Sequence, residues 1–534
     1  MKKAISIFLA MAMLLCLCSC RNVSDNVYSS SETTSQLQSS IESILDENSS
    51  ANQSEQTVDS SALENTSSKE NVSSTPDNTT SSEIPKATKP YEGKLPTMSA
   101  NNIPQFPNRK FDLSGFWAPY EITEESFKQY KDAGFTTLAM INHSLSNSSE
   151  NQFYLGSKRT MKALEICRKV GLNAILNYND WKAEQCEGSR YNGATPFSKY
   201  DLYSDYKDII TGIHICDEPY VKHIDIYGNK TLVDDFKAVY PNAKYIVNLI
   251  PYTAVSSRGF ESYDQMMEIY EQNFMEPFQN PFVSVDVYPF HEGSGLDDGT
   301  LALNYEYIAK SAKKYGVKPG FILQSSVGGG EFESELSEGD LRWEINAALG
   351  FGADTLQYYC YSVPKTFLNT GTVSCMYDYC ILNRDDTPSP IYYHLQKLHK
   401  EIQSFSNVIL AYDWNETIGI MGEGEYVGRV SNIIYDSDFN VKTFSNPKHY
   451  VAATTTQEMI VSHFTNDKYG EAYMFVNFAD RKSNSAKVTF RDCKSIAIYS
   501  SKNGLTPKIV NLDKNGQVTL DFEYGDGLFV IPLI

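Results

Sequence analysis

Residues 210–219 read ITGIHICDEP, a short and mainly apolar run that ends in two carboxylates and a proline. A short apolar run of this kind is typical of a buried strand. Similar runs recur along the chain, and amphipathic helical segments lie between most of them. The predicted strands are Phe111–Ala118, Thr137–Ile141, Asn173–Asn177, Ile210–Cys216, Tyr245–Ile250, Phe282–Tyr288, Gly320–Gln324 and Thr355–Tyr361. Eight strands that alternate with helices predict the α/β class and a (β/α)₈ TIM barrel.

The helical segments carry their own stop signals. Thr123–Ala133 and Lys158–Val170 have apolar residues at three- and four-residue intervals, and each is followed by a glycine, as a helix C-terminus requires. A last helix over Pro390–Ser404 should complete a barrel domain of residues 100–406. Beyond Trp414 the pattern changes to short strands separated by Gly, Asn and Asp turns, which predicts a small all-β sandwich over 410–534.

The N-terminal residues predict export. Lys2 and Lys3 precede the apolar run Ala4–Leu17, which is short for a membrane span and suits a signal sequence. The run ends in Leu-Cys-Ser-Cys, which resembles a bacterial lipobox with Cys20 as the lipidated residue. We therefore expect residues 1–20 to be a lipoprotein signal and the protein to be lipid-anchored on the extracellular face of the membrane. Residues 21–95 are rich in Ser, Thr and Asn, which predicts a disordered tether.

Composition excludes several classes of function. The formal net charge of −20 argues against nucleic acid as a partner, and against any membrane contact other than the lipid anchor. No nucleotide-binding glycine motif occurs, and no cofactor is expected. Of ten cysteines, seven lie outside the signal, and their spacing fits neither a disulfide framework nor a metal site. Cys375 and Cys380 could pair within one loop. His143 and His214 lack a carboxylate at metal-ligand spacing and are interpreted as hydrogen-bonding or core residues.

Barrel enzymes carry their chemistry at the C-terminal ends of the strands. In this chain those ends are rich in carboxylates, amides and aromatic rings. The candidate substrate-binding residues there are Trp117, Asn142, His143, Asn179, Asp180, Asp217, Tyr288, Gln324 and Tyr358. Aromatic faces pack on the C–H surfaces of sugars, while the polar side chains bond hydroxyl groups. The rim therefore favours a carbohydrate as substrate or ligand.

Asp217-Glu218-Pro219 resembles the Asn/Asp-Glu-Pro motif that ends strand 4 in clan-A glycoside hydrolases. The resemblance covers roughly residues 111–404 and extends to Asp286-Val-Tyr-Pro on strand 6. It implies that Glu218 is the general acid/base and that Asp217 bonds a substrate hydroxyl. The alternative is a helix N-terminus at which two acidic residues complement the dipole.

This chain departs from the resemblance at the position of the second carboxyl that a glycosidase needs. The clan places a glutamate at the end of strand 7, where this chain has Gln324, and an amide cannot act as a nucleophile. Three replacements remain open: Glu331, Asp286 and Asp180. For Asp286, alternation along the strand predicts a side chain that faces the barrel interior. Asp286 could instead be a hydrogen-bonded core residue, and Glu331 could belong to a solvated acidic surface.

The hypothesis that follows is a cell-surface glycoside hydrolase that uses carboxylate general acid/base chemistry. The alternative is a catalytically inactive surface glycan-binding lipoprotein with a glycosidase-like barrel. A structural adhesin is a third interpretation, and it depends on the tether and sandwich alone.

Overall fold

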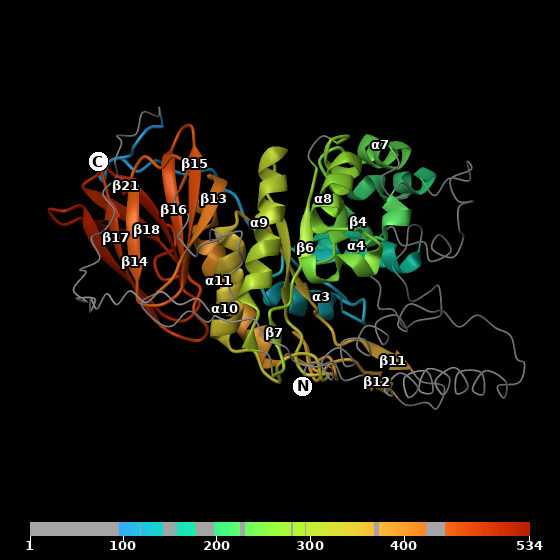
Figure 1. Ribbon diagram of the computed structural model, residues 1–534. Helices are drawn as coiled ribbons and strands as arrows, with labels where there is room; N and C mark the ends of the chain where they lie inside the picture. The colour runs from blue at the N-terminus through green and yellow to red at the C-terminus, as the bar shows by residue number, and fades with distance from the viewer. Residues whose placement is uncertain are drawn as a thin grey trace, which may run out of the picture. The chain divides into compact units, whose positions relative to one another are not determined.

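The computed structural model describes residues 95–534, except for residue 118 and residues 142–152, 154–156, 178–196, 225–229, 279–280, 294, 368–372 and 423–443. Figure 1 shows a strand core surrounded by helices, followed by a second, all-β part. None of the helices within these described ranges is both long and apolar enough to cross a bilayer.

Eight parallel strands form one sheet in the order β1-β10-β9-β6-β5-β4-β3-β2. They are β1 (Asp112–Gly115), β2 (Thr137–Ala139), β3 (Asn173–Asn177), β4 (Ile210–Asp217), β5 (Lys244–Leu249), β6 (Ser284–Asp286), β9 (Gly320–Gln324) and β10 (Thr355–Tyr359). The two edge strands approach each other, since Thr136 N donates to Leu113 O at 2.9 Å. The sheet is therefore nearly closed into a barrel, as the sequence predicted.

Helices cover the outside of this sheet. They are α3 (Glu124–Asp132), α4 (Lys158–Val170), α7 (Lys230–Val239), α8 (Tyr263–Tyr270), α9 (Asp298–Lys314), α10 (Glu338–Gly350) and α11 (Pro390–Ile409), with the 3₁₀ segments η2 (Phe197–Tyr206), η3 (Val221–His223) and η4 (Tyr252–Arg258) and the short π-helical η5 (Glu271–Met275). Local sequence explains the ends of α4: the Ser157 hydroxyl accepts from Thr160 N, and Gly171 adopts φ +76°. The last barrel helix continues beyond the predicted Ser404, as far as Ile409.

Side chains along the barrel strands alternate between two environments. Val283, Val285 and Val287 are buried among the helices, in the main hydrophobic core. Ser284 and Asp286 face the barrel interior, where both bond Asn248. The bottom of the interior is filled by Ile175, Ile246 and Phe282, which form a small separate cluster. The polar positions of the interior therefore gather towards the C-terminal ends of the strands.

The C-terminal part packs two antiparallel sheets. One has the order β13-β15-β16-β21-β18-β19 and the other has the order β14-β17-β20. Their strands are β13 (Asp413–Ile420), β14 (Tyr450–Thr455), β15 (Met459–Asn466), β16 (Gly470–Asn477), β17 (Asn484–Phe490), β18 (Ser495–Tyr499), β19 (Lys508–Asn511), β20 (Gln517–Phe522) and β21 (Gly527–Leu533). A separate apolar cluster lies between the sheets. The sandwich confirms the predicted fold class, and β19 is a strand that the sequence pattern did not predict.

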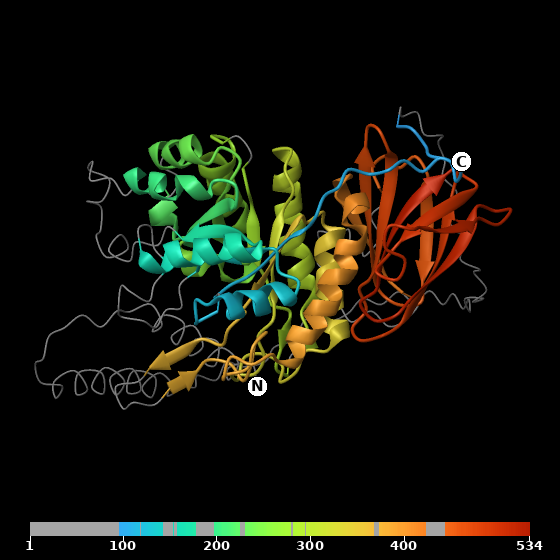
Figure 2. The same cartoon turned by 180° about the vertical axis from the view of Figure 1, so that it is seen from behind.

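The barrel packs on the sandwich through α10. Trp343 is fully buried and stacks on Phe478 with ring centroids 4.8 Å apart. Asn346 Nδ2 donates to Gly525 O at 2.8 Å, and Tyr524 donates its hydroxyl hydrogen to Asp340 at 2.7 Å. Figures 1 and 2 show α10 and α11 on the side of the barrel next to the sandwich.

Candidate active site

Glu218 directly follows β4 and has an unusual backbone conformation. Its φ is +45°, a left-handed value that residues other than glycine adopt rarely. The Glu218 N–H donates to Asn248 O at 3.0 Å, which holds this turn against the end of β5. The side chain retains 22% exposure. A strained position that presents a half-buried carboxylate at a barrel mouth is a candidate functional residue.

An irregularity in β4 brings Asp217 to the same place. The pairing of β4 with β5 shifts between His214 and Cys216, so that His214 lies opposite Ile246 and Asp217 opposite Asn248. Both partners on β5 face the barrel interior. Strict alternation from His214 would have placed Cys216 at the interior and Asp217 on the helix side. The bulge therefore places the carboxylate of Asp217 at the mouth, instead of the thiol of Cys216.

Asn248 connects two of the three carboxyl groups. Its Nδ2 donates to Asp286 Oδ1 at 2.8 Å and to Asp217 Oδ1 at 3.1 Å. Ser284 Oγ donates to Asn248 Oδ1 at 3.3 Å, which fixes the orientation of the amide. A hydrogen bond also joins the carboxyls of Asp286 and Glu218. Asp217, Glu218 and Asp286 thus form one hydrogen-bonded cluster, called here the carboxyl cluster.

Crowding of like charges governs protonation in the carboxyl cluster. Burial, and then the charges of Glu218 and Asp217, raise the pKa of Asp286 well above its ordinary value. Burial and the Asp217 charge also raise the pKa of Glu218. Burial raises the pKa of Asp217, although its side chain keeps solvent access at the mouth. Because the pKa of Asp286 is the one raised well above its ordinary value, we expect the proton of the pair to lie on Asp286.

Arg258 supplies the opposing charge. It ends η4, and its Nη2 makes an ion pair with Glu218 Oε2. Nη1 donates to the Tyr220 hydroxyl at 3.1 Å, and the guanidinium lies over the Tyr220 ring at 4.9 Å from the centroid. This positive charge lowers the pKa of Glu218 against the effect of burial. Arg258 therefore favours the ionised form of Glu218 while no ligand is bound.

Aromatic rings form a platform beside the carboxyl cluster. Tyr288 stacks on Tyr359 with centroids 5.1 Å apart, and Tyr359 contacts Trp117 at 5.0 Å. Tyr377 donates its hydroxyl hydrogen to Tyr359 at 3.4 Å. Burial, and then the Asp286 charge, raise the pKa of Tyr288, which places this ring next to the carboxyls. Such faces suit the C–H surface of a sugar ring.

The structure brings together Glu218, Asp217, Asp286, Tyr288 and Trp117 from the predicted set. Three other predicted residues, Gln324, Tyr358 and Glu331, have different surroundings. Four further residues and the lipidation site lie outside the described residues: Asn142, His143, Asn179, Asp180 and Cys20.

Gln324 and Tyr358 are both fully buried in the structure. Gln324 is fully buried, and its side-chain amide bonds Phe290 N at 2.9 Å and Phe290 O at 3.1 Å. Tyr358 is also fully buried and packs against Phe135 and His399 on the helix side of the sheet. Tyr359, the next residue, has the inward position that the sequence analysis gave to Tyr358.

Glu331 lies on the turn after β9, and its side chain is exposed. Burial of its surroundings raises its pKa, and the neighbouring His291 lowers it. The charged partners of Glu218 are Asp217, Arg258 and Asp286, on other elements. The structure therefore does not join Glu331 to the carboxyl cluster.

Asn248, Arg258 and Tyr359 were not among the predicted site residues, although Tyr359 lies at a strand end where such residues were expected. Alternation along β5 and β10 contained a signal for Asn248 and Tyr359. Each lies two residues after another residue of the interior face, Ile246 on β5 and Gln357 on β10. Arg258 is 40 residues from Glu218 and belongs to no motif.

His214 matches its interpretation as a core residue: it is buried against Phe116, and burial lowers its pKa to about 4. Across the described part of the chain, no cluster of His, Cys, Asp and Glu is suited to hold a metal ion.

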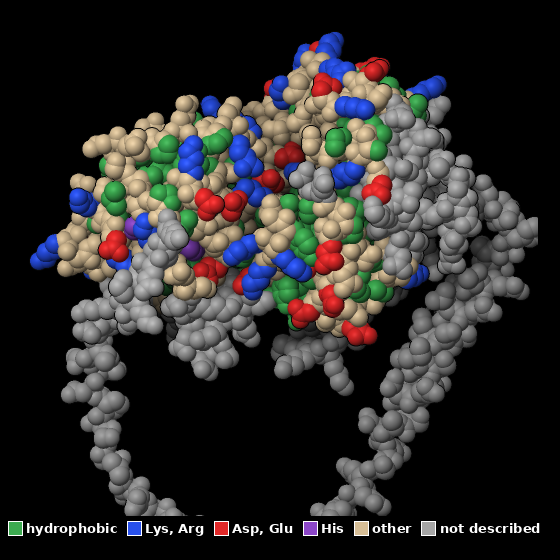
Figure 3. Space-filling model, turned by 90° about the horizontal axis from the view of Figure 1, so that it is seen from above, with side chains coloured by type: hydrophobic (Ala, Val, Ile, Leu, Met, Phe, Trp, Pro, Cys, Tyr) green, Lys and Arg blue, Asp and Glu red, His purple; other side chains and the backbone are tan. Residues whose placement is uncertain are grey.

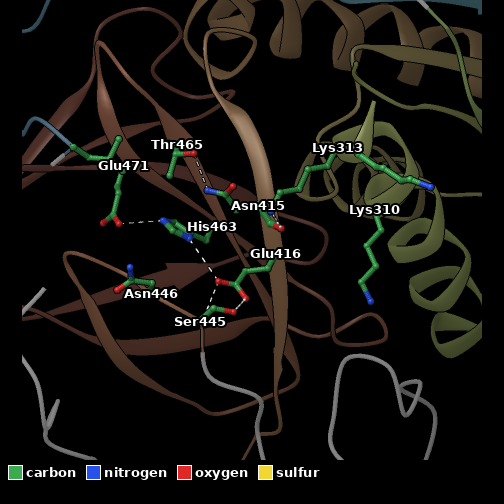
Figure 4. A pocket seen from close by; sticks show the side chains of 11 residues that line it. Lys310, Lys313, Asn415, Glu416, Ser445, Asn446, His463, Thr465 and Glu471 are labelled. Carbon is green, nitrogen blue, oxygen red and sulfur yellow. Dashed lines mark hydrogen bonds and ion pairs between the residues drawn. The ribbon is translucent and has the colours of Figure 1, made fainter. Parts of the chain in front are cut away.

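A polar hollow of about 720 Å³ lies between α9 and the sandwich, away from the carboxyl cluster. Figure 4 shows Glu471, His463 and Glu416 in a row along its wall, opposite Lys310 and Lys313. His463 Nε2 lies 3.2 Å from Glu471 Oε1, and Lys313 donates to Asn415 O at 2.9 Å. On the face seen in Figure 3, acidic and basic side chains are interspersed. Lys310 pairs with Glu306, Lys314 pairs with Glu271, and His463 lies between Glu416 and Glu471, so we place the candidate chemistry at the barrel mouth.

No protein-family model matches the chain, and no curated protein is significantly similar to it in sequence. Among solved structures it is similar to a family 39 glycoside hydrolase from Bacteroides cellulosilyticus WH2, with a TM-score of 0.44 and 11% identity over 80% of this chain and 81% of that one. A GH30 endoxylanase from Clostridium papyrosolvens C71 gives a TM-score of 0.35 and 12% identity over 80% and 98%. An arabinofuranosidase gives 0.39 and 12% over 81% and 98%. These values are too low to carry an argument about activity, which therefore depends on the residues of this chain.

Proposed function

We propose that this chain is a glycoside hydrolase in which Glu218 is the general acid/base. The observation that carries the proposal is the hydrogen-bonded contact between Glu218 and Asp286 at the C-terminal mouth of the barrel. A glycosidase needs one protonated and one ionised carboxyl beside the scissile bond. The aromatic platform of Tyr288, Tyr359 and Trp117 offers a sugar-binding surface next to this pair.

One proton shared by two carboxyls supplies both roles. While the proton is on Asp286, Glu218 is ionised and pairs with Arg258. Transfer of that proton to Glu218 leaves a neutral acid at the mouth and an ionised Asp286, which Asn248 Nδ2 stabilises from 2.8 Å. Glu218 can then protonate the leaving oxygen, and Asp286 becomes the second carboxyl of the reaction.

The spacing of the pair favours retention of configuration. A hydrogen bond between carboxyls brings their oxygens to about 2.5–3.0 Å. Retaining pairs are about 5–5.5 Å apart and inverting pairs about 6.5–9.5 Å apart. A pair in direct contact is nearer to the retaining spacing than to the inverting one, so we infer retention.

The experiment is release of reducing sugar from a panel of oligo- and polysaccharides by the wild type, Glu218→Gln, Asp286→Asn and the control Glu331→Gln. We expect losses of about 10²–10⁴-fold in the first two variants and normal turnover in the control. Proton NMR of the first product should show the anomer of retention. Activity that survives in Glu218→Gln would remove Glu218 from its role.

A second candidate function is glycan binding without catalysis. Two observations favour it: Glu218 is already engaged by Arg258, and the strand that should supply the clan's second carboxyl ends in the neutral, buried Gln324. Calorimetry should then show that the wild type and Glu218→Gln bind an oligosaccharide with equal affinity, and neither should release reducing sugar. That result would establish a binding protein.

We also propose that the protein is attached to the outer face of a bacterial membrane through a lipid on Cys20. The basic residues, the apolar run and the lipobox-like end of residues 1–20 support this location. A diacylated cysteine gives durable anchoring, which a single acyl chain does not. The Ser- and Thr-rich residues 21–95 would then tether the barrel to the membrane.

A further inference from the structure

Two buried thiols lie in contact at the edge of the aromatic platform. Cys360 directly follows β10, and Cys380 lies in the loop before α11. Their sulfur atoms are 3.3 Å apart, and both side chains are fully buried. We propose that Cys360 and Cys380 form a disulfide bond in the mature protein. This inference does not depend on the proposed catalytic activity.

The backbones on either side already run together. Ile381 N donates to Cys360 O at 3.3 Å, and Leu382 N donates to Tyr361 O at 2.9 Å. These two bonds hold the segment that contains Cys380 against the end of β10. An S–S bond of about 2.05 Å therefore requires the sulfur atoms to approach by only about 1.2 Å. Rotation of the two side chains can supply that movement.

Cys375 and Cys380 are nearer in sequence and could pair within one loop, but their surroundings differ. In the structure Cys375 ends β12 (Val373–Cys375) and lies opposite Lys365 of β11 (Lys365–Phe367). The sulfur of Cys380 contacts Cys360 and Ser326 Oγ, the latter at 3.5 Å. Within the residues that the structure describes, Cys360 and Cys380 are the cysteines whose sulfur atoms meet.

The chemistry is thiol–disulfide exchange. Cys360 and Cys380 each lose a proton, one S–S bond forms, and two electrons reduce an external disulfide to two thiols. That oxidant is glutathione disulfide or the active-site disulfide of a protein oxidase. Burial raises the pKa of Cys360 well above its ordinary value, so its thiol is neutral in the folded chain, and both side chains are inaccessible. The exchange must therefore take place during folding, before the loop closes over the pair.

The bond would close a loop that supports the platform. Residues 361–379 contain the β11–β12 hairpin and Tyr377, whose hydroxyl bonds that of Tyr359. Cys360 is the next residue after Tyr359. A disulfide at this point would fix Tyr377 beside Tyr359, the ring that stacks on Tyr288 and contacts Trp117.

The test is oxidative refolding of the full chain. Denatured, reduced protein is refolded in a mixture of glutathione and glutathione disulfide, then unfolded in iodoacetamide without reductant, digested and examined by mass spectrometry. We expect one peptide pair joined through Cys360 and Cys380, lighter by two hydrogens than its separate parts. Cys167, Cys216, Cys375 and Cys493 should carry the alkyl group. Alkylated Cys360 and Cys380, or Cys375 joined to Cys380, would overturn the proposal.

Thermal unfolding provides a second readout. Reductant should lower the Tm of the oxidised wild type by a few degrees, because the closed loop restricts the unfolded chain. The double variant Cys360→Ser/Cys380→Ser should show no response to reductant, whereas the control Cys375→Ser should respond like the wild type. A response that persists in the double variant would assign the effect to other cysteines and reject the pair.

Discussion

Removal of the Arg258 charge should raise the pKa of Glu218 and move the pH dependence of the carboxyl cluster. The change is Arg258→Met, which keeps much of the aliphatic volume and deletes the guanidinium. In the structure Arg258 pairs with Glu218 and donates to Tyr220 at 3.1 Å. Both charged side chains are 22% exposed, so neither is fully screened by water. In the methionine variant, burial and the Asp217 charge raise the pKa of Glu218 against the Asp286 hydrogen bond alone.

The size of the effect follows from the contact. Two unit charges about 4 Å apart near a protein surface attract by about 4 kcal/mol at an effective dielectric constant of 20. Partial exposure and rearrangement of water reduce this gain to roughly 1.5–3 kcal/mol. Since one pKa unit corresponds to about 1.4 kcal/mol, the upper macroscopic pKa of the cluster should rise by roughly 1–2 units. The acid form of Glu218 then persists to higher pH.

The assay is the pH profile of kcat/KM on an oligosaccharide that the wild type cleaves. The alkaline limb, on which the general acid is lost, should shift upward in Arg258→Met. A carbon-13 NMR titration of the Glu218 carboxyl gives the same quantity without turnover. Lys397→Met is the matched control, because it deletes a positive charge that pairs with Glu338 on the exposed surface. An unshifted limb and carboxyl titration in Arg258→Met would refute the control of Glu218 protonation by Arg258.

Three further predictions concern other parts of the chain. Tyr359→Ala should weaken oligosaccharide binding about tenfold by calorimetry, because a stacked ring is lost, whereas Tyr358→Phe should bind normally; equal losses would reject the platform. Cys20→Ala should abolish incorporation of radiolabelled fatty acid, and continued labelling would place the lipid elsewhere. Burial raises the pKa of Glu471, but its hydrogen bond to His463 and its other contacts bring that pKa below the ordinary value. Burial lowers the pKa of His463, but its bonds to Glu416 and Glu471 bring that pKa above the ordinary value. Unfolding free energy should therefore fall as pH drops through the Glu471 pKa and as pH rises through the His463 pKa, with a maximum between them; a flat pH profile of urea midpoints would contradict this pairing.

Much of the barrel could be predicted because its strands are short, apolar and separated by helix stop signals. β3 and β9 have the predicted bounds, since each runs from a polar or glycine start to a polar end. β6 is shorter than predicted and covers only Ser284–Asp286. Proline at 281 and 289 flanks it, and proline cannot donate to a ladder. Apolar pattern indicates where a strand lies, while its ends depend on which neighbours remain available for pairing.

The candidate site was harder to predict, because adjacent residues of a strand face opposite ways. Tyr358 and Tyr359 are identical in type, and only the direction of the strand separates a core ring from a platform ring. Gln357 donates to Ser114 of the neighbouring strand β1 at 3.1 Å, on the interior face, so Tyr359 shares its side and Tyr358 does not. The polar Gln357 among apolar neighbours was the signal in the sequence for which face of the strand is the interior one. Arg258 had none, since its contact with Glu218 depends on the path of the loop after β5.

The two left-handed residues at the barrel mouth connect these observations. Trp117 and Glu218 follow β1 and β4, and each has a positive φ without being glycine. Such a conformation costs about 1–3 kcal/mol, so surrounding contacts must hold it in place. For Glu218 those contacts are the backbone bond to Asn248, the hydrogen bond with Asp286 and the ion pair with Arg258. A glycine at 218 would remove the strain and the cluster together. The fold therefore holds a carboxylate in an unfavourable backbone conformation at the one end of the barrel where such groups act on a ligand.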